Sequence, residues 1–239
     1  MISFVGMSSR SSGKIRGLQI SKSLNFKFFD SARVPIESLD NVVILIRNQA
    51  GDFARFLKSR EHVVGYDLLD MPVGDLIFRN REVNLSNYID DGIDFYIVNN
   101  SYQKLELEKH TNSKVFIIPH HTVNYENIRL CRGLDAKKFG YVGLPSQIDN
   151  ALEIKSFIES MGGTFTLYNP KSREECVECF KEIDVGIVYL DRENKWFKDI
   201  VEQKPNTKLS NFQSFGIPTI CTRYKSFEEF GSGANLFVN

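Results

Sequence analysis

Short apolar runs rich in Val, Ile and Phe alternate along this chain with segments whose apolar residues recur at helical spacing. This alternation is typical of parallel β-sheets whose two faces are covered by helices, so we predict an α/β fold. The apolar runs predict strands at 2–5, 26–29, 42–46, 63–66, 95–98, 115–118, 139–142, 165–168, 185–189, 218–221 and 236–238. The helical spacing predicts helices at 17–24, 50–59, 101–109, 148–161, 172–183, 207–215 and 226–230.

The pattern starts again near Lys138, which indicates two consecutive α/β domains. The segment Thr122–Lys137 is polar and lacks a clear periodicity, and we interpret it as the connection between them. We place the boundary near Asp135, which gives an N-terminal domain of residues 1–135 and a C-terminal domain of residues 136–239. The alternative is one doubly wound sheet of about eleven strands, which is long for an open twisted sheet.

Charge and composition narrow the class of protein. Thirty Lys and Arg residues balance thirty Asp and Glu residues, which argues against a protein that coats nucleic acid. No apolar stretch reaches the roughly 18 residues of a membrane span, and the first residues do not resemble a secretory signal. The four cysteines are too few and too irregular for a disulfide framework. We therefore expect a cytoplasmic protein with reduced cysteines, among them a buried Cys221.

The loop after the first predicted strand, Gly6–Lys14, is small, rich in hydroxyl groups and ends in Gly-Lys. In open parallel sheets, ligands bind beyond the carboxyl ends of the strands. A Walker phosphate-binding motif would need Gly at position 8 and Ser or Thr at position 15, where Ser8 and Ile15 stand. We interpret the loop either as a polar cover for a phosphate or acceptor, or as a solvated connection. Its candidate residues are Ser11, Ser12, Gly13 and Lys14.

Two carboxylates, Asp67 and Asp70, follow the strand predicted at 63–66. A general base for a hydroxyl nucleophile needs such a position, at the end of a buried strand and facing a cleft. The alternative is that Asp70 caps a helix beginning near Pro72. Either carboxylate is thus a candidate catalytic residue.

A histidine pair, His120 and His121, follows the strand predicted at 115–118. Adjacent residues of an extended chain point to opposite sides, so only one of the two could face a given site. Because His62 and His110 show no ligand spacing either, we predict no metal. We expect one histidine of the pair, His120, to line a cleft between the domains and to act there as an alternative base. The CxxC at Cys176 lies within a predicted helix without a second such pair, so a zinc site is not expected.

The stretch from Lys204 to Ile220 is the most informative part of the chain. A polar, basic segment leads into the helix predicted at 207–215, which Gly216 ends, and an apolar strand follows. The positive end of the helix dipole and Lys208 together predict a binding site for a diphosphate. An ordinary capped amphipathic helix does not by itself explain this clustering of lysine, asparagine and threonine.

Lys208-Leu209, the helix that follows, and Gly216-Ile217-Pro218-Thr219-Ile220 resemble the donor-site signature of GT-B glycosyltransferases. Phe139–Gly143 (FGYVG), at the start of the second half, also looks like this family. The resemblance covers most of the chain in layout and about forty residues in motif. It implies two Rossmann-like domains that face each other across a cleft, with the nucleotide-sugar in the C-terminal domain and the acceptor in the N-terminal one.

The resemblance also implies roles for individual residues. Lys208 matches the family lysine that contacts the donor diphosphate, and Gly143 matches the glycine near the phosphates. Many members bind the donor ribose with a glutamate five residues before the helix-ending glycine, where this chain has the uncharged Asn211. Lys204 and Thr207 complete the expected donor site.

Two further features bear on the resemblance. The chain contains no Asp-x-Asp, the motif of the metal-dependent GT-A type, and this fits a metal-independent enzyme. Typical members are longer and finish with a helix that crosses back to the N-terminal domain, whereas this sequence finishes after the strand predicted at 236–238. A minimal member, a truncated chain and one part of a larger enzyme are all compatible with this difference.

The sequence therefore predicts a glycosyltransferase that moves a sugar from a UDP- or GDP-type donor to a hydroxyl group of a glycan, lipid-linked or protein acceptor. Asp70, Asp67 or His120 would take the acceptor proton if the reaction inverts. No cofactor and no nucleic-acid partner are expected, while peripheral contact with a membrane and the oligomeric state are left open. The alternatives are a non-catalytic nucleotide- or sugar-binding module and a nucleotide-sugar epimerase of similar architecture.

Overall fold

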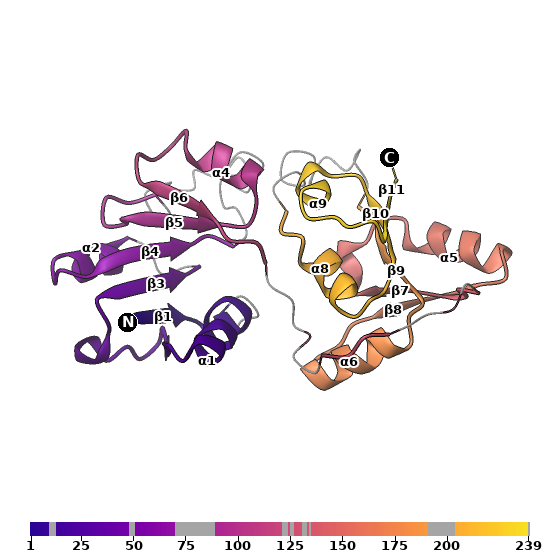
Figure 1. Cartoon of the computed structure of the whole chain (residues 1–239), viewed down its shortest axis with the longest axis horizontal. Helices are drawn as coiled ribbons and strands as arrows, with labels where there is room; N and C mark the ends of the chain where they lie inside the picture. The colour runs from indigo at the N-terminus through magenta and orange to yellow at the C-terminus, as the bar shows by residue number, and fades with distance from the viewer. Residues whose placement is uncertain are drawn as a thin grey trace. The chain divides into compact units, whose positions relative to one another are not determined.

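The computed structural model describes residues 1–9, 13–47, 51–69, 89–120, 124, 127–130, 133, 135–190 and 204–238. The chain forms two compact units, each built on its own parallel sheet (Figure 1). The first unit comprises Met1–His120 and Glu202–Pro205, and the second comprises His121–Val201 and Asn206–Asn239. Two sheets in place of one are confirmed. The division falls between His120 and His121, whereas the sequence pattern places it near Asp135.

The first unit contains a six-stranded sheet in the order β2-β1-β3-β4-β5-β6, and every described pairing is parallel. The strands are β1 (Ile2–Gly6), β2 (Lys27–Asp30), β3 (Val42–Ile46), β4 (Val63–Asp67), β5 (Phe95–Val98) and β6 (Lys114–Ile117). From β1 the chain runs outward to β2 and then returns past β1 to form β3. The strand order therefore reverses between β1 and β3, which is the topological switch point of this sheet.

Helices cover both faces of the first sheet. They are η1 (Gly13–Gln19), α1 (Ile20–Leu24), η2 (Ile36–Ser38), α2 (Asp52–Lys58) and α4 (Ser101–Leu107). Leu57 of α2 and Leu107 of α4 pack into the cluster on one face, while Ile20 of α1 packs against the cluster on the other. The single helix predicted at 17–24 is wrong in its start, because a π-helical turn, η1, already begins at Gly13.

The second unit contains a five-stranded parallel sheet in the order β11-β10-β9-β7-β8. Its strands are β7 (Lys138–Val142), β8 (Thr164–Tyr168), β9 (Val185–Val188), β10 (Thr219–Thr222) and β11 (Asn235–Val238). Its helices are η4 (Pro145–Gln147), α5 (Ala151–Ser160), α6 (Arg173–Lys181), α8 (Thr207–Ser214) and α9 (Lys225–Glu228). The strand order reverses between β7 and β9, so the switch point of this sheet lies there.

The core of the second unit has two layers, one on each face of the sheet (Figure 1). Helices α6, α8 and α9 lie on one face, where Phe180 stacks on Phe215 with ring centroids 4.6 Å apart and meets Phe212 edge-on. Helix α5 lies on the other face and packs Ile158 among aromatic and aliphatic residues of β7, β8 and β9. Cys221 is fully buried, as predicted.

The helix ends in this unit follow the local signals of the sequence. Ser172 caps α6 by accepting a hydrogen bond from Glu175 N, as the predicted Ser start implies. Gly162 and Gly216 follow the ends of α5 and α8 with φ of 78° and 75°, a conformation that favours glycine. None of the described helices is both long and apolar enough to cross a membrane.

Candidate functional site at the switch point of the second sheet

The switch point between β7 and β9 brings together residues that are far apart in the sequence. Gly143, directly after β7, has a φ of 148° and donates its N–H to Tyr168 O at 2.9 Å. A Cβ atom at this position would lie 3.1 Å from Lys208 Cε. The missing side chain of Gly143 therefore gives Lys208, from the first turn of α8, room to lie over the end of β7.

Lys208 contacts two uncharged groups at this position. Its Nζ donates a hydrogen bond to Gln147 Oε1 at 3.1 Å and lies 5.6 Å from the centroid of the Tyr141 ring. Tyr141 is fully buried, and its hydroxyl donates to Leu144 O at 3.1 Å. Burial raises the pKa of Tyr141 well above its ordinary value, so the phenol stays neutral. Neither group reduces the positive charge of the lysine.

The two helices that begin at this edge have no side-chain cap from the residue before them, within the described part of the chain. Asn206 precedes α8 and Asn150 precedes α5, and neither side chain accepts a hydrogen bond from its helix. The first N–H groups of any helix lack intrahelical acceptors and carry its positive partial charge. Helix α6 begins farther from the switch point, after β8, and there Ser172 makes the cap. The uncapped N-termini thus border the switch point, where an anion would meet them.

Two buried acceptors lie near Lys208 in the sequence, one directly before α8 and one within it. Asn206 Oδ1 and Asn211 Oδ1 are shielded from solvent and accept no hydrogen bond from any described residue. An unpaired buried acceptor costs about 1–3 kcal/mol, so such groups are uncommon. A ligand hydroxyl or amide donor that reached either oxygen would remove this cost. Asn211 is the position at which the sequence predicts a contact with the donor ribose.

Sequence reasoning identified Gly143, Lys208 and Asn211 at this edge but missed Tyr141, Gln147 and Asn206. One available signal was that Gln147 lies in the loop after a strand-ending glycine. The two remaining predicted donor residues, Thr207 and Lys204, belong to different units. Thr207, half-buried, is the first residue of α8, whereas Lys204 is grouped by its contacts with the first unit, so its donor role stays a prediction.

In the first unit, Asp67 is part of a buried ion pair. Arg16 Nε donates to Asp67 Oδ2 at 2.7 Å, and the two residues are 1% and 2% exposed. Arg16 Nη1 also donates to Ile118 O and Pro119 O, at 3.2 and 3.1 Å. The pair therefore links η1 to the ends of β4 and β6. This arrangement favours a structural role for Asp67, which was predicted as a candidate base.

The other predicted residues of the first unit are scattered. His120 is buried three residues after β6. Gly13 and Lys14 belong to η1 and not to a loop: Gly13 is buried and leaves no room for a Cβ atom beside Met7 O, and Lys14 is exposed. Asp70, Ser11 and Ser12 lie outside the described residues, as does the helix predicted near Pro72.

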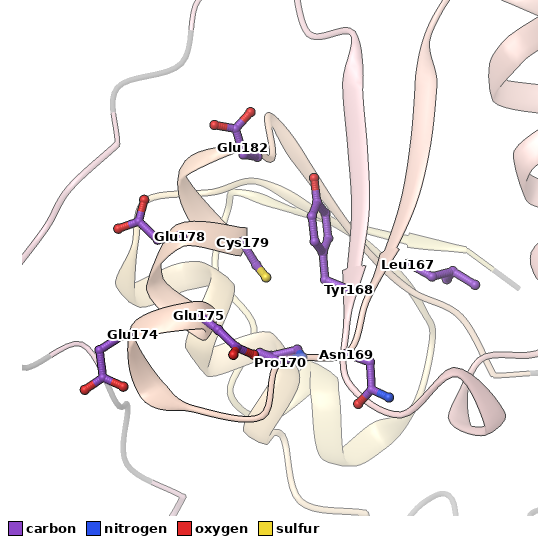
Figure 2. A pocket seen from close by; sticks show the side chains of 9 residues that line it. All are labelled: Leu167, Tyr168, Asn169, Pro170, Glu174, Glu175, Glu178, Cys179 and Glu182. Atoms are coloured by element: carbon purple, nitrogen blue, oxygen red, sulfur yellow. The ribbon is translucent and has the colours of Figure 1, made fainter.

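A hollow of about 610 Å³ lies between α6 and the end of β8 (Figure 2). Figure 2 shows Tyr168 of β8 beside Cys179, Leu167 pointing to the other side of the strand, and carboxylates along α6 and directly after its end. The carboxylates belong to Glu174, Glu175, Glu178 and Glu182. Two of them already face lysines, because Lys181 Nζ pairs with Glu178 at 2.6 Å and Lys138 Nζ with Glu182 at 3.3 Å. This hollow would repel a phosphate and is not a candidate donor site.

Neither a metal-binding cluster in the described part of the chain nor a match to a known family or curated protein assigns a chemistry to this site. Within the described residues, no group of three or more His, Cys, Asp or Glu side chains could hold a metal ion. Scanning the chain against models of known protein families finds no match, and no curated protein matches it either. Any function of the site must therefore be inferred from the residues that form it.

Proposed function

We propose that the second unit binds a nucleoside diphosphate-sugar and that the chain transfers the sugar to a hydroxyl group of an acceptor. The observation that carries this proposal is the position of Lys208 beside Gly143, at the switch point of a parallel sheet. In such sheets, ligands bind at the switch point beyond the carboxyl ends of the strands. A lysine there, next to two uncapped helix N-termini, suits the charge of a diphosphate.

In this proposal the diphosphate is the leaving group. The bond between the anomeric carbon of the sugar and the β-phosphate oxygen breaks, a bond from the acceptor oxygen to that carbon forms, and the acceptor proton passes to a base. The charge on the departing nucleoside diphosphate would be stabilised by Lys208 and by the N–H groups at the start of α8. The proposal includes a GT-B arrangement, in which the first unit supplies the acceptor side.

Lys208→Ala tests the proposal directly. The proposal rests on a charge-assisted contact, so we expect the affinity for UDP or GDP to fall about 10- to 100-fold while the fold is retained. Calorimetric titration with UDP and GDP gives the affinities, and thermal unfolding shows whether bound nucleotide stabilises the protein. Lys155→Ala, which removes an exposed lysine of α5, is the matched control and should bind as the wild type does. Unchanged affinity in Lys208→Ala would remove the basis of the proposal.

A non-catalytic nucleotide-binding module is the second candidate. It is favoured by Asp67, because a carboxylate paired with Arg16 in the interior is a poor general base. Transfer and slow hydrolysis of UDP- or GDP-sugars distinguish the two functions. An enzyme of the proposed class releases nucleoside diphosphate from the donor that it binds, whereas a binding module releases none.

A further inference from the structure

We propose that Gln147 is a positioning residue that orients Lys208 for the diphosphate without neutralising its charge. This inference deepens the proposed function and rests on it. Gln147 Oε1 accepts the hydrogen bond from Lys208 Nζ at 3.1 Å. The two residues are 61 positions apart in the sequence and meet across the switch point, since Gln147 ends η4 after β7 and Lys208 lies in the first turn of α8.

The first step of the argument concerns the freedom of the lysine side chain. A lysine loses up to about 2 kcal/mol of rotamer entropy when a ligand fixes it, and this loss weakens binding. Gln147 and the face of the Tyr141 ring hold the ammonium group before any ligand arrives. Gly143 keeps the space next to Lys208 Cε open. Part of the ordering is therefore complete in the free protein.

The second step concerns charge. A carboxylate in place of the Gln147 amide would hold the ammonium more strongly, but it would also compete with the phosphate for it. An amide oxygen orients the lysine without placing a negative charge beside it. The neutral, buried Tyr141 phenol has the same property. Glutamine is thus the long side chain that meets both requirements at this position.

The test compares three variants by calorimetric titration with inorganic pyrophosphate, UDP and GDP. Gln147→Met keeps the length of the side chain but removes the acceptor, and we expect it to weaken binding about 2- to 10-fold. Gln147→Glu introduces a competing carboxylate and should weaken binding further, by about tenfold or more. Ser156→Glu places the same charge on the exposed face of α5 and should bind as the wild type does.

A merely structural role for Gln147 predicts a different result. Both Gln147 variants would then lower the protection of segment 138–148 against hydrogen exchange. They would also lower the affinity for all three ligands and the stability of the fold together. Equal affinity in Gln147→Glu and wild type would overturn the positioning role while leaving the proposed function standing. A wild-type protein that binds none of the three ligands would instead remove the proposed function, and this inference with it.

Discussion

The carboxyl edges of the two parallel sheets differ in how their polar groups are used. In the first unit the edge is closed by internal contacts: Arg16 pairs with Asp67, and Asp30 accepts hydrogen bonds from Ser8 N and Oγ. In the second unit the edge carries Lys208, two helix starts without side-chain caps, and two buried acceptors with no described partner. Among the described residues, the charged groups at the first edge thus contact one another, whereas the second edge carries the lysine and the helix starts on which the proposed donor site is based.

One buried polar atom at the first edge is an exception to this difference, because it has no partner among the described residues. Asn99, at the end of β5, donates from Nδ2 to Leu69 O, and Gln103 Nε2 donates to the same carbonyl at 3.3 Å. Asn99 Oδ1 nevertheless accepts no bond from the described residues. Leu69 itself has a left-handed φ of 48°, so two amide donors fix a backbone conformation that is costly for leucine. These contacts position the backbone after β4 and do not form a charged site.

The largest effect is expected from Arg16→Ala. The change leaves the Asp67 carboxylate buried without its partner, which should destabilise the first unit by about 3–5 kcal/mol. Hydrogen exchange measured peptide by peptide separates the two units, and the second unit should keep its protection and its nucleotide affinity. Lys14→Ala, an exposed neighbour in η1, serves as the control and should change little. Loss of protection in both units alike would contradict the separation of roles.

A second effect, a loss of stability of the first unit, should appear at low pH. Burial raises the pKa of Asp94, but its contacts with Lys58 and Val64 N lower it more, so the net shift is downward. The pKa of Asp40 is likewise lowered overall, and the pKa of Asp30 is lowered chiefly by its hydrogen bond from Ser8. All three carboxyls belong to the first unit, whereas the second unit has a lowered pKa at the exposed Glu174, chiefly because of a backbone hydrogen bond at the start of α6.

The direction of this pH effect follows from linkage. A folded pKa below the unfolded value means that the unfolded chain takes up the proton first as the pH falls. The stabilisation is therefore complete above an unfolded aspartate pKa of about 3.9 and is lost as the pH falls through the lower folded values. We expect pepsin to cleave the first unit before the second as the pH is lowered from about 5 to 2.5, with cut sites mapped by mass spectrometry. Earlier cleavage of the second unit would contradict this prediction.

The smallest effect compares the starts of two helices in the second unit. Ser172→Ala removes the cap of α6 and should cost about 1 kcal/mol. Asn206→Ala removes a side chain that makes no cap bond and carries an unpaired buried oxygen, so it should change the free energy of unfolding by less than about 0.5 kcal/mol. Urea unfolding measures both changes. Equal losses would mean that Asn206 supports α8 in a way that its contacts do not reveal.

The sequence by itself determined the elements and many of their ends. The strands at 42–46 and 95–98 were predicted with the observed bounds, and Ser172 and Gly216 mark helix ends where the sequence placed them. These features depend on residues a few positions apart, because hydrophobic period, side-chain caps and the conformational freedom of glycine act over one or two turns. The parallel α/β character follows from the same short-range pattern.

Only the tertiary structure decided which of these elements meet and what their polar ends do. The sequence makes Asp67 a candidate base, but the fold pairs it with Arg16, 51 residues away. Nothing in the sequence links Gln147 to Lys208, and only the fold brings the two together. Gly13, where η1 begins, also lies so close to Met7 that a Cβ atom there would overlap Met7 O, a contact between neighbouring turns that the sequence does not show. Strand order is the physical reason for this limit. The order places the loops of distant strands at one edge, and the length and period of each strand carry no information about its neighbours.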